Sequence, residues 1–142
     1  MGVQVDVSGL EKFRDRLLAL DGRQREEFME SAVKGLAARL LADVKNATPV
    51  GQYPAGSGKT GGTLRRRWKA GGAVRKGGTV SVEVKNPVEY APYVEYGHRT
   101  RGGKGWIPGR FMLTSSERSL SRDMPKIMEA KLRKFIGGLA NG

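Results

Sequence analysis

The sequence contains no cysteine and one histidine among its 142 residues. Without cysteine there are no disulfides, thiolate metal ligands or cysteine nucleophiles, which fits a protein made in a reducing compartment. A single histidine also excludes a histidine-based metal cluster, and we expect no cofactor. No apolar stretch reaches the roughly 20 residues of a membrane helix, and the N-terminus lacks the pattern of a signal peptide. We therefore expect a soluble protein without membrane partners.

Acidic residues are scarce in the middle of the chain, where basic residues are abundant. Residues 1–50 hold 8 Lys and Arg against 8 Asp and Glu, residues 51–110 hold 12 against 3, and residues 111–142 hold 6 against 3. The formal net charge of +12 is therefore concentrated in the central segment, which carries +9. A localised excess of this kind predicts an acidic protein surface or nucleic acid as the partner, and a solvated basic surface is the alternative.

Hydrophobic periodicity predicts helices near both ends of the chain. Spacings of three and four residues predict one helix over 10–20, ended by a turn at Asp21-Gly22, and a longer helix over 23–47. A final helix is expected over 111–139. Pro125 lacks the N–H that an internal helical residue donates, so we expect a kink or a restart just before it.

Alternating patterns predict strands between these helices. Valines alternating with polar residues predict a short strand over 3–7, and residues 64–70 and 79–85 predict an antiparallel hairpin. Residues 51–63 hold five glycines and show no apolar periodicity, which predicts a mobile loop. The core-facing side chains of the first hairpin strand would be Leu64, Arg66 and Trp68. The arginine in that set is a conflict that the pattern leaves open.

These elements together predict one domain over residues 1–142. A chain of this length buries one core of modest size rather than two. The expected fold class is α+β, with two or three helices covering a small antiparallel sheet and with long, glycine-rich basic loops.

A tyrosine-rich stretch passes directly into a basic, glycine-rich segment. Tyrosines at every third position between 90 and 96 would share roughly one face of a helical turn. The loop expected over 97–110 holds four Lys and Arg, five glycines and one large apolar anchor, a composition that suits contact with another macromolecule. The alternative is that the tyrosines seat a short helix on the sheet. The predicted subunit or partner interface comprises Tyr90, Tyr93, Tyr96, Arg99, Arg101, Lys104, Trp106 and Arg110.

Five further cations lie on the predicted hairpin and its turn. Alternation would place the first three of them on the strand face that points away from the core. We expect them to contact DNA or an acidic partner protein, since phosphate and carboxylate groups pair with such side chains. They are Arg65, Arg67, Lys69, Arg75 and Lys76. Trp68 and Trp106 with the tyrosines would offer a platform for stacking on unpaired bases, which is a further alternative.

Two patterns suggestive of enzymes are rejected. The GSGKT run at 56–60 resembles part of a phosphate-binding loop, but that motif requires a glycine where Tyr53 stands, so a flexible loop is the better interpretation. His98 would need Glu89 or Glu95 as a partner, and no nucleophile is assigned. We therefore predict no catalytic residues, no metal site and no enzymatic activity, with a hydrolase based on His98 and Glu95 as a minor alternative.

Several motifs follow one another in a recognisable order. They are TPV at 48–50, TGGTLRRRW at 60–68, NPVEYAPYVEYGHR at 86–99 and PGRFM at 108–112. This order resembles the siphophage tail-component family of neck and tail-completion proteins, typified by the tenth gene product of the Hong Kong lambdoid phage. The likeness extends over most of the chain, from VQVDVSGLEKF at 3–13 to the final helix.

The resemblance implies a structural virion protein of the head-tail connector. Such a protein would assemble as a ring, with sixfold symmetry expected, where the head joins the tail around the DNA channel. Its partners would be copies of itself, neighbouring connector and tail proteins, and DNA in the channel. Its location would be the neck or tail region of the virion, and the host cytoplasm during assembly. A stand-alone basic nucleic-acid-binding module is the alternative.

Overall fold

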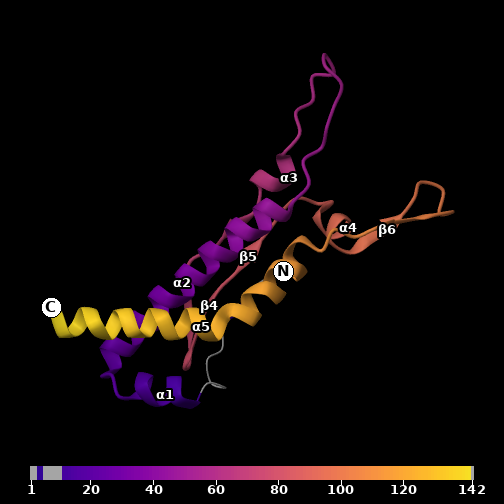
Figure 1. Cartoon of the computed structure of the whole chain (residues 1–142). Coiled ribbons are helices and arrows are strands. Elements are labelled where there is room, and N and C mark those ends of the chain that lie inside the picture. The colour runs from indigo at the N-terminus through magenta and orange to yellow at the C-terminus, as the bar shows by residue number, and fades with distance from the viewer. Residues whose placement is uncertain (1–2, 5–10, 142) are drawn as a thin grey trace.

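The computed structural model describes residues 3–4 and 11–141, which form a mixed fold around two long helices (Figure 1). The helices are α1 (Glu11–Leu18), α2 (Gly22–Ala47), α3 (Thr63–Arg66), α4 (Ala91–Tyr96) and α5 (Met112–Asn141). The strands are β1 (Val3–Gln4), β2 (Lys69–Ala70), β3 (Val74–Lys76), β4 (Thr79–Val82), β5 (Val84–Lys85), β6 (Gly97–Arg99) and β7 (Trp106–Pro108). Helices and small antiparallel sheets in one arrangement confirm the predicted α+β fold class.

The core lies where α2 and α5 pack against each other and α2 packs against the strands. Apolar residues of α2 recur at three- and four-residue spacings, which gives this helix one buried face. Leu36, Leu40 and Val44 on that face are at most 1% exposed, as are Met128 and Leu132 of α5. Burying a side chain of this kind stabilises the fold by about 1.5–3 kcal/mol. The helix predicted over 23–47 is confirmed.

A divided hairpin supplies most of the sheet structure. β3 pairs antiparallel with β4, β2 pairs antiparallel with β5, and β1 pairs with the other edge of β4. Val80, Val82 and Val84 are buried while Ser81 between them is half-buried, as expected for strands with one core-facing side. The predicted pairing of 64–70 with 79–85 is confirmed only for residues 69–70 and 84–85. β4 pairs instead with residues 74–76, which the prediction placed in the connecting turn. The strand predicted over 3–7 lies mostly outside the described residues.

The segment expected to begin the first hairpin strand is instead a turn of helix. α3 follows Gly62, whose φ of 95° is left-handed, and Arg67 after it also has a helical backbone. Leu64 and Trp68 are four residues apart and lie on the same side, with exposed fractions of 6% and 2%. Arg66 is exposed. The strand prediction is wrong here, and the conflict over Arg66 disappears because the period is 3.6 residues rather than two.

A capping box builds the turn between α1 and α2. The Asp21 carboxylate accepts a hydrogen bond from the Gln24 backbone N–H at 2.8 Å, and the Gln24 side-chain oxygen accepts from the Asp21 N–H at 3.2 Å. Asp21-Gly22 therefore starts α2 and is not the C-cap of the preceding helix, which corrects the prediction. At the end of α1, the Arg25 guanidinium takes this role by donating hydrogen bonds to backbone carbonyl oxygens, including that of Leu20 at 3.0 Å.

The last helix is continuous but bent. α5 runs from Met112 to Asn141 with Pro125 inside it, so no second helix restarts before the proline. Figure 1 shows the ribbon changing direction between its orange and yellow parts. A proline cannot donate the i to i−4 hydrogen bond and its ring crowds the preceding turn, which accounts for a bend of this kind. The kink that the sequence predicts is therefore present without a break.

Candidate functional site

Two arms project from one end of the core (Figure 1). The loop arm comprises residues 49–62, between α2 and α3, and the hairpin arm comprises residues 97–108, which include β6 and β7. Neither arm contains an acidic residue. Their cations are Lys59, Arg99, Arg101 and Lys104. This end of the molecule therefore presents positive charge on two extended elements, as the central charge excess predicts.

The hairpin arm is an ordered two-stranded ribbon, whereas the sequence predicts a loop there. Arg99 lies opposite Trp106, and His98 lies opposite Ile107. Thr100 closes the turn, because its hydroxyl accepts a hydrogen bond from a backbone N–H at 2.9 Å. Trp106 is 60% exposed and Ile107 is 45% exposed. The ribbon thus carries a large aromatic and a branched apolar side chain into solvent beside its arginines.

Close backbone contacts fix the base of the hairpin arm. Gly97 has a φ of 88°, and a Cβ there would lie 2.7 Å from a backbone oxygen of β7. A Cβ on Gly109 would collide with the carbonyl oxygen of Glu95. The Arg110 backbone N–H donates to the carbonyl oxygen of Val94 at 2.8 Å. These contacts hold the ribbon at a set angle to α4, so its exposed side chains are presented in a defined direction.

Glu95 joins α4 to the start of α5. Its side chain is fully buried, and its carboxylate accepts hydrogen bonds from the Leu113 N–H at 3.0 Å and from the Thr114 N–H at 2.8 Å and hydroxyl at 3.0 Å. The first N–H groups of a helix lack intrahelical partners and favour negative charge nearby. Phe111, the residue before α5, cannot cap it with a side-chain oxygen and has a φ of 48°. Glu95 supplies the cap from a distant part of the chain.

The pairing of His98 with Glu95 is not formed. The Glu95 carboxylate is engaged by α5, while His98 Nδ1 lies 3.3 Å from the carbonyl oxygen of Tyr93. Burial, and then the negative charge of Glu95, raise the pKa of the nearby Glu117 carboxyl above its ordinary value. The capping role of Glu95 was not predicted from the sequence. Its signal is the lack of any Ser, Thr, Asp or Asn immediately before the helix that starts at Met112.

Aromatic side chains cover the surface of α4. Tyr90, Tyr93 and Tyr96 are 47%, 58% and 54% exposed, whereas Ala91 and Glu95 take the buried positions. The alternative in which the tyrosines seat α4 on the sheet is therefore wrong. Among the described residues, eight of the eleven exposed large hydrophobic side chains belong to this end of the molecule. They are Val50, Tyr53, Tyr90, Tyr93, Tyr96, Trp106, Ile107 and Phe111. Such a concentration is typical of a binding surface.

Two of the five cations predicted to contact DNA or an acidic partner have partners within the chain. The Arg65 guanidinium donates to the carbonyl oxygen of Thr48 at 2.7 and 3.2 Å. Arg75 forms ion pairs with Glu26 and Glu30, and hydrogen bonds from Lys34 and then Arg75 hold the pKa of Glu30 below its ordinary value. Arg67, Lys69, Arg75 and Lys76 are exposed, and Arg65 is half-buried. Contact of all five with DNA or an acidic protein stays a prediction.

Trp68 is a core residue, so the alternative in which it stacks on unpaired bases is wrong. Its indole N–H donates to the Thr48 hydroxyl oxygen at 2.8 Å, and that hydroxyl donates to the Val44 carbonyl oxygen at 2.6 Å. The Asn86 side-chain amide donates to the Leu64 carbonyl oxygen at 2.7 Å. Side chains from three of the recognised motifs thus tie the end of α2 to α3 and to the segment before α4. They form the platform from which both arms extend.

Three features weighed from the sequence can be compared with the described residues, namely a metal site, a phosphate-binding loop and a membrane helix. Within this part of the chain, no three histidine or carboxylate side chains converge to hold a metal ion. The GSGKT run at 56–60 is exposed in the loop arm and lies between two helices. None of the described helices combines the length and the apolar character that spanning a bilayer needs.

The fold is a small α+β domain with exposed aromatic and cationic side chains gathered at one end. A family model described as "Bacteriophage HK97-gp10, putative tail-component" matches residues 11–97. The match covers more than half of the chain, and the chain belongs to this family of bacteriophage tail components. The family is structural, which implies a non-enzymatic role. Comparisons with curated proteins and with solved structures gave no significant match.

Proposed function

We propose that this tail component is a structural protein of the head-tail connector that assembles as a ring around the DNA channel, with sixfold symmetry expected. The observation that carries the proposal is the gathering of exposed aromatic side chains and acid-free cationic arms at one end of a packed core. Interfaces are enriched in tyrosine, tryptophan and arginine, and these are the side chains that this end presents.

The core and the arms have separate roles in this proposal. α2 and α5 form a packed scaffold, and the arms reach from it toward neighbouring copies and toward connector and tail proteins. The hairpin arm brings Trp106 and Ile107 with Arg99 to the contact. Exposed cations that do not contact protein face acidic partner rings or the DNA. The protein would reside in the neck or tail region of the virion and assemble in the host cytoplasm.

Particles made without this protein test the proposed place in the virion. We expect electron micrographs to show filled heads and separate tails, with joining restored by the wild-type chain. A Trp106→Ser variant should fail to restore joining, because it removes the largest exposed side chain of the hairpin arm. Leu18→Ser is the matched control, since Leu18 is 55% exposed on α1, away from the arms. Joined virions in the absence of the protein would refute the assignment.

The ring itself is tested on the purified protein. Sedimentation velocity and negative-stain micrographs should show closed rings of uniform size when neighbouring connector or tail proteins are supplied. If no rings formed under any of these conditions, while heads and tails still needed the protein in order to join, ring assembly alone would be refuted.

A nucleic-acid-binding module is the second candidate, favoured by the absence of acidic residues from both arms. Its signature is a steep salt dependence, because log affinity falls by about 0.9 per log unit of salt for each phosphate neutralised. We expect the tail component to bind duplex DNA weakly and without sequence preference. Tight DNA binding with a salt slope corresponding to several phosphates, in a protein that joins no particle, would favour the module.

A further inference from the structure

We propose that a groove at the base of the loop arm binds an extended acidic segment of a neighbouring virion protein, which inserts one large apolar side chain. The groove has a volume of about 390 Å3 and lies between the loop arm, the start of α3 and α4. Sites of several hundred Å3 suit a side chain or a small ligand. The inference rests on the proposed function for the identity of the partner, whereas the binding chemistry follows from the groove itself.

The floor and the rim of the groove differ in chemistry. Val50, Leu64 and Val94 contribute apolar surface, and Tyr53 and Tyr90 add aromatic rings with hydroxyl groups. Such a lining favours an apolar side chain that enters with its backbone held at the polar rim. Among the residues that the structure describes, none that lines the groove is acidic.

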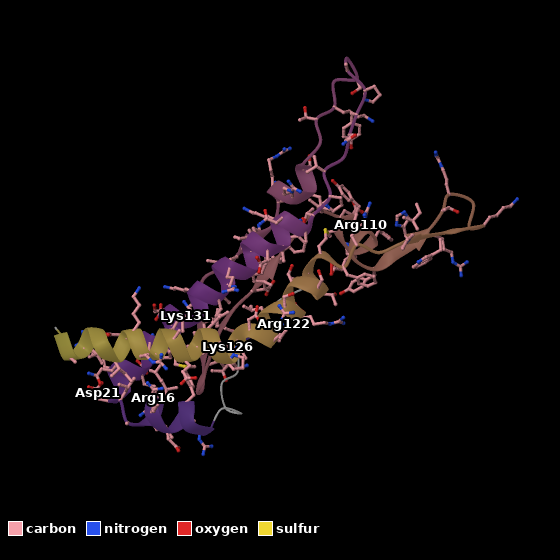
Figure 2. The ribbon with its side chains drawn as sticks, in the orientation of Figure 1. Arg16, Asp21, Arg110, Arg122, Lys126 and Lys131 are labelled. Carbon is pink, nitrogen blue, oxygen red and sulfur yellow. The ribbon has the colours of Figure 1, made fainter. Side chains whose placement is uncertain are left out.

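Arg110 gives the groove its charge preference. It also lines the groove, and Figure 2 shows it where the two arms meet the core. The described part of the chain provides no carboxylate within ion-pair distance of its guanidinium. Lys59, whose Nζ lies 5.7 Å from the centre of the Tyr53 ring, adds a second cation beside the lining. A carboxylate from another chain would satisfy the guanidinium with paired hydrogen bonds, because arginine matches carboxylate geometry.

The walls of the groove are held in place before any partner binds. A Cβ on Gly61 would collide with the carbonyl oxygen of Gly51, so the two legs of the loop arm touch there. The Arg65 guanidinium holds the Thr48 carbonyl oxygen at the start of the first leg. Arg66 donates to the Gly61 carbonyl oxygen at 3.1 Å on the second leg. Arg65 and Arg66 thus hold the two legs of the loop arm. A site that is already formed loses less conformational entropy when a partner binds.

An acidic protein segment fits this groove better than the other occupants. A nucleic acid needs an array of cations along its backbone, whereas Arg110 is the one cation among the described residues that line the groove. The hairpin arm of a second copy would bring Arg99 toward Arg110, and like charges disfavour that contact. The hairpin arm of the same chain is held away by its fixed base at Gly97 and Gly109.

Fluorescence anisotropy with defined probes tests the proposal. The probe is a short labelled peptide in which aspartates and glutamates flank one phenylalanine. Matched peptides replace the acids by asparagine and glutamine, or the phenylalanine by serine, and a labelled DNA oligonucleotide is the third comparison. Arg110→Gln removes the guanidinium that lines the groove, and Arg118→Gln, on the exposed surface of α5, removes the same charge elsewhere.

We expect the acidic phenylalanine peptide to bind the wild type and to lose about tenfold or more in affinity with Arg110→Gln, as for a charge-assisted hydrogen bond. Each altered peptide should bind more weakly, and Arg118→Gln should bind as the wild type does. No measurable binding to the wild type, an equal loss with both variants, or tighter DNA binding that also needs Arg110 would overturn the inference. Peptide binding in a protein that proves dispensable for particle joining would refute the proposed function and leave the groove's chemistry standing.

Discussion

Replacing Glu95 by alanine is expected to destabilise the fold at the junction of α4 and α5. The substitution removes a fully buried carboxylate that accepts hydrogen bonds from Leu113 and Thr114. It leaves two backbone N–H groups and one hydroxyl at the start of α5 without their acceptor. Losing a helix cap costs about 1 kcal/mol, and leaving a buried donor unpaired costs about 1–3 kcal/mol.

The expected loss for Glu95→Ala is about 3 kcal/mol in the free energy of unfolding. It falls below the sum of the separate costs because alanine also relieves the desolvation of a carboxylate, and water can enter the space left behind. Glu95→Gln should lose less, about 1–2 kcal/mol, since its amide oxygen can still accept from Thr114 while its NH2 group faces an N–H donor. A domain of ordinary stability has about 5–15 kcal/mol to lose, so both variants should still fold.

Equilibrium unfolding in urea measures these differences, and Glu89→Ala is the control. Glu89 is an exposed carboxylate in the same segment, so its loss should stay within about 0.5 kcal/mol. Hydrogen exchange adds a local readout, because the amide of Arg110 is bonded to Val94 and should exchange faster once the α4 to α5 junction loosens. If Glu95→Ala matched Glu89→Ala in stability, the carboxylate would not be holding the start of α5, and the reasoning would fail.

Three further substitutions test other parts of the structure. Gly97→Ala forces a side chain onto a left-handed residue that touches backbone, so we expect the free energy of unfolding, measured in urea, to fall by about 2 kcal/mol or more. Tryptophan fluorescence of the same variant reports whether the hairpin arm moves. Trp68→Phe leaves the Thr48 hydroxyl without its indole donor, and we expect a loss of about 1–2 kcal/mol, with an unchanged melting temperature as the contradicting result. Glu117→Gln should stabilise the protein at neutral pH, because a raised folded pKa means that the ionised carboxyl is disfavoured in the folded state. The gain should vanish at about pH 3, below the unfolded pKa, and thermal melts at both pH values measure it.

The sequence predicts the long helices well because their signal is local. α2 repeats apolar residues over many turns, and a capping pair marks its start, although the residue that caps it was first assigned to the preceding turn. Val80, Val82 and Val84 alternate cleanly, and the strands they belong to are present. In each case the pattern covers neighbouring positions, so tertiary contacts have little to override.

The errors come from positions where two patterns coincide or where the partner is distant in sequence. Leu64 and Trp68 share a strand face and also a helix face, and only the left-handed Gly62 before them selects the helix. Glu95 carries no local sign of its role, because the helix that it caps begins 17 residues later at Met112. The exposed side chains around Trp106 were predicted from composition. A segment rich in glycines and cations that shows no hydrophobic periodicity already indicates a surface element.

The distribution of charge bears on how such a protein would assemble. Each copy has a formal net charge of +12, and its arms contain cations without any acid, so contacts that bring arms together are opposed by repulsion. At physiological salt this repulsion acts over about 8 Å, which spans a subunit contact but not a particle. In the proposed ring, burial of Trp106 and the tyrosines of α4 would favour association, while the charge would delay it until an anionic partner is present. A connector of the proposed kind would therefore form its ring on the particle, where acidic surfaces or DNA would neutralise the arms.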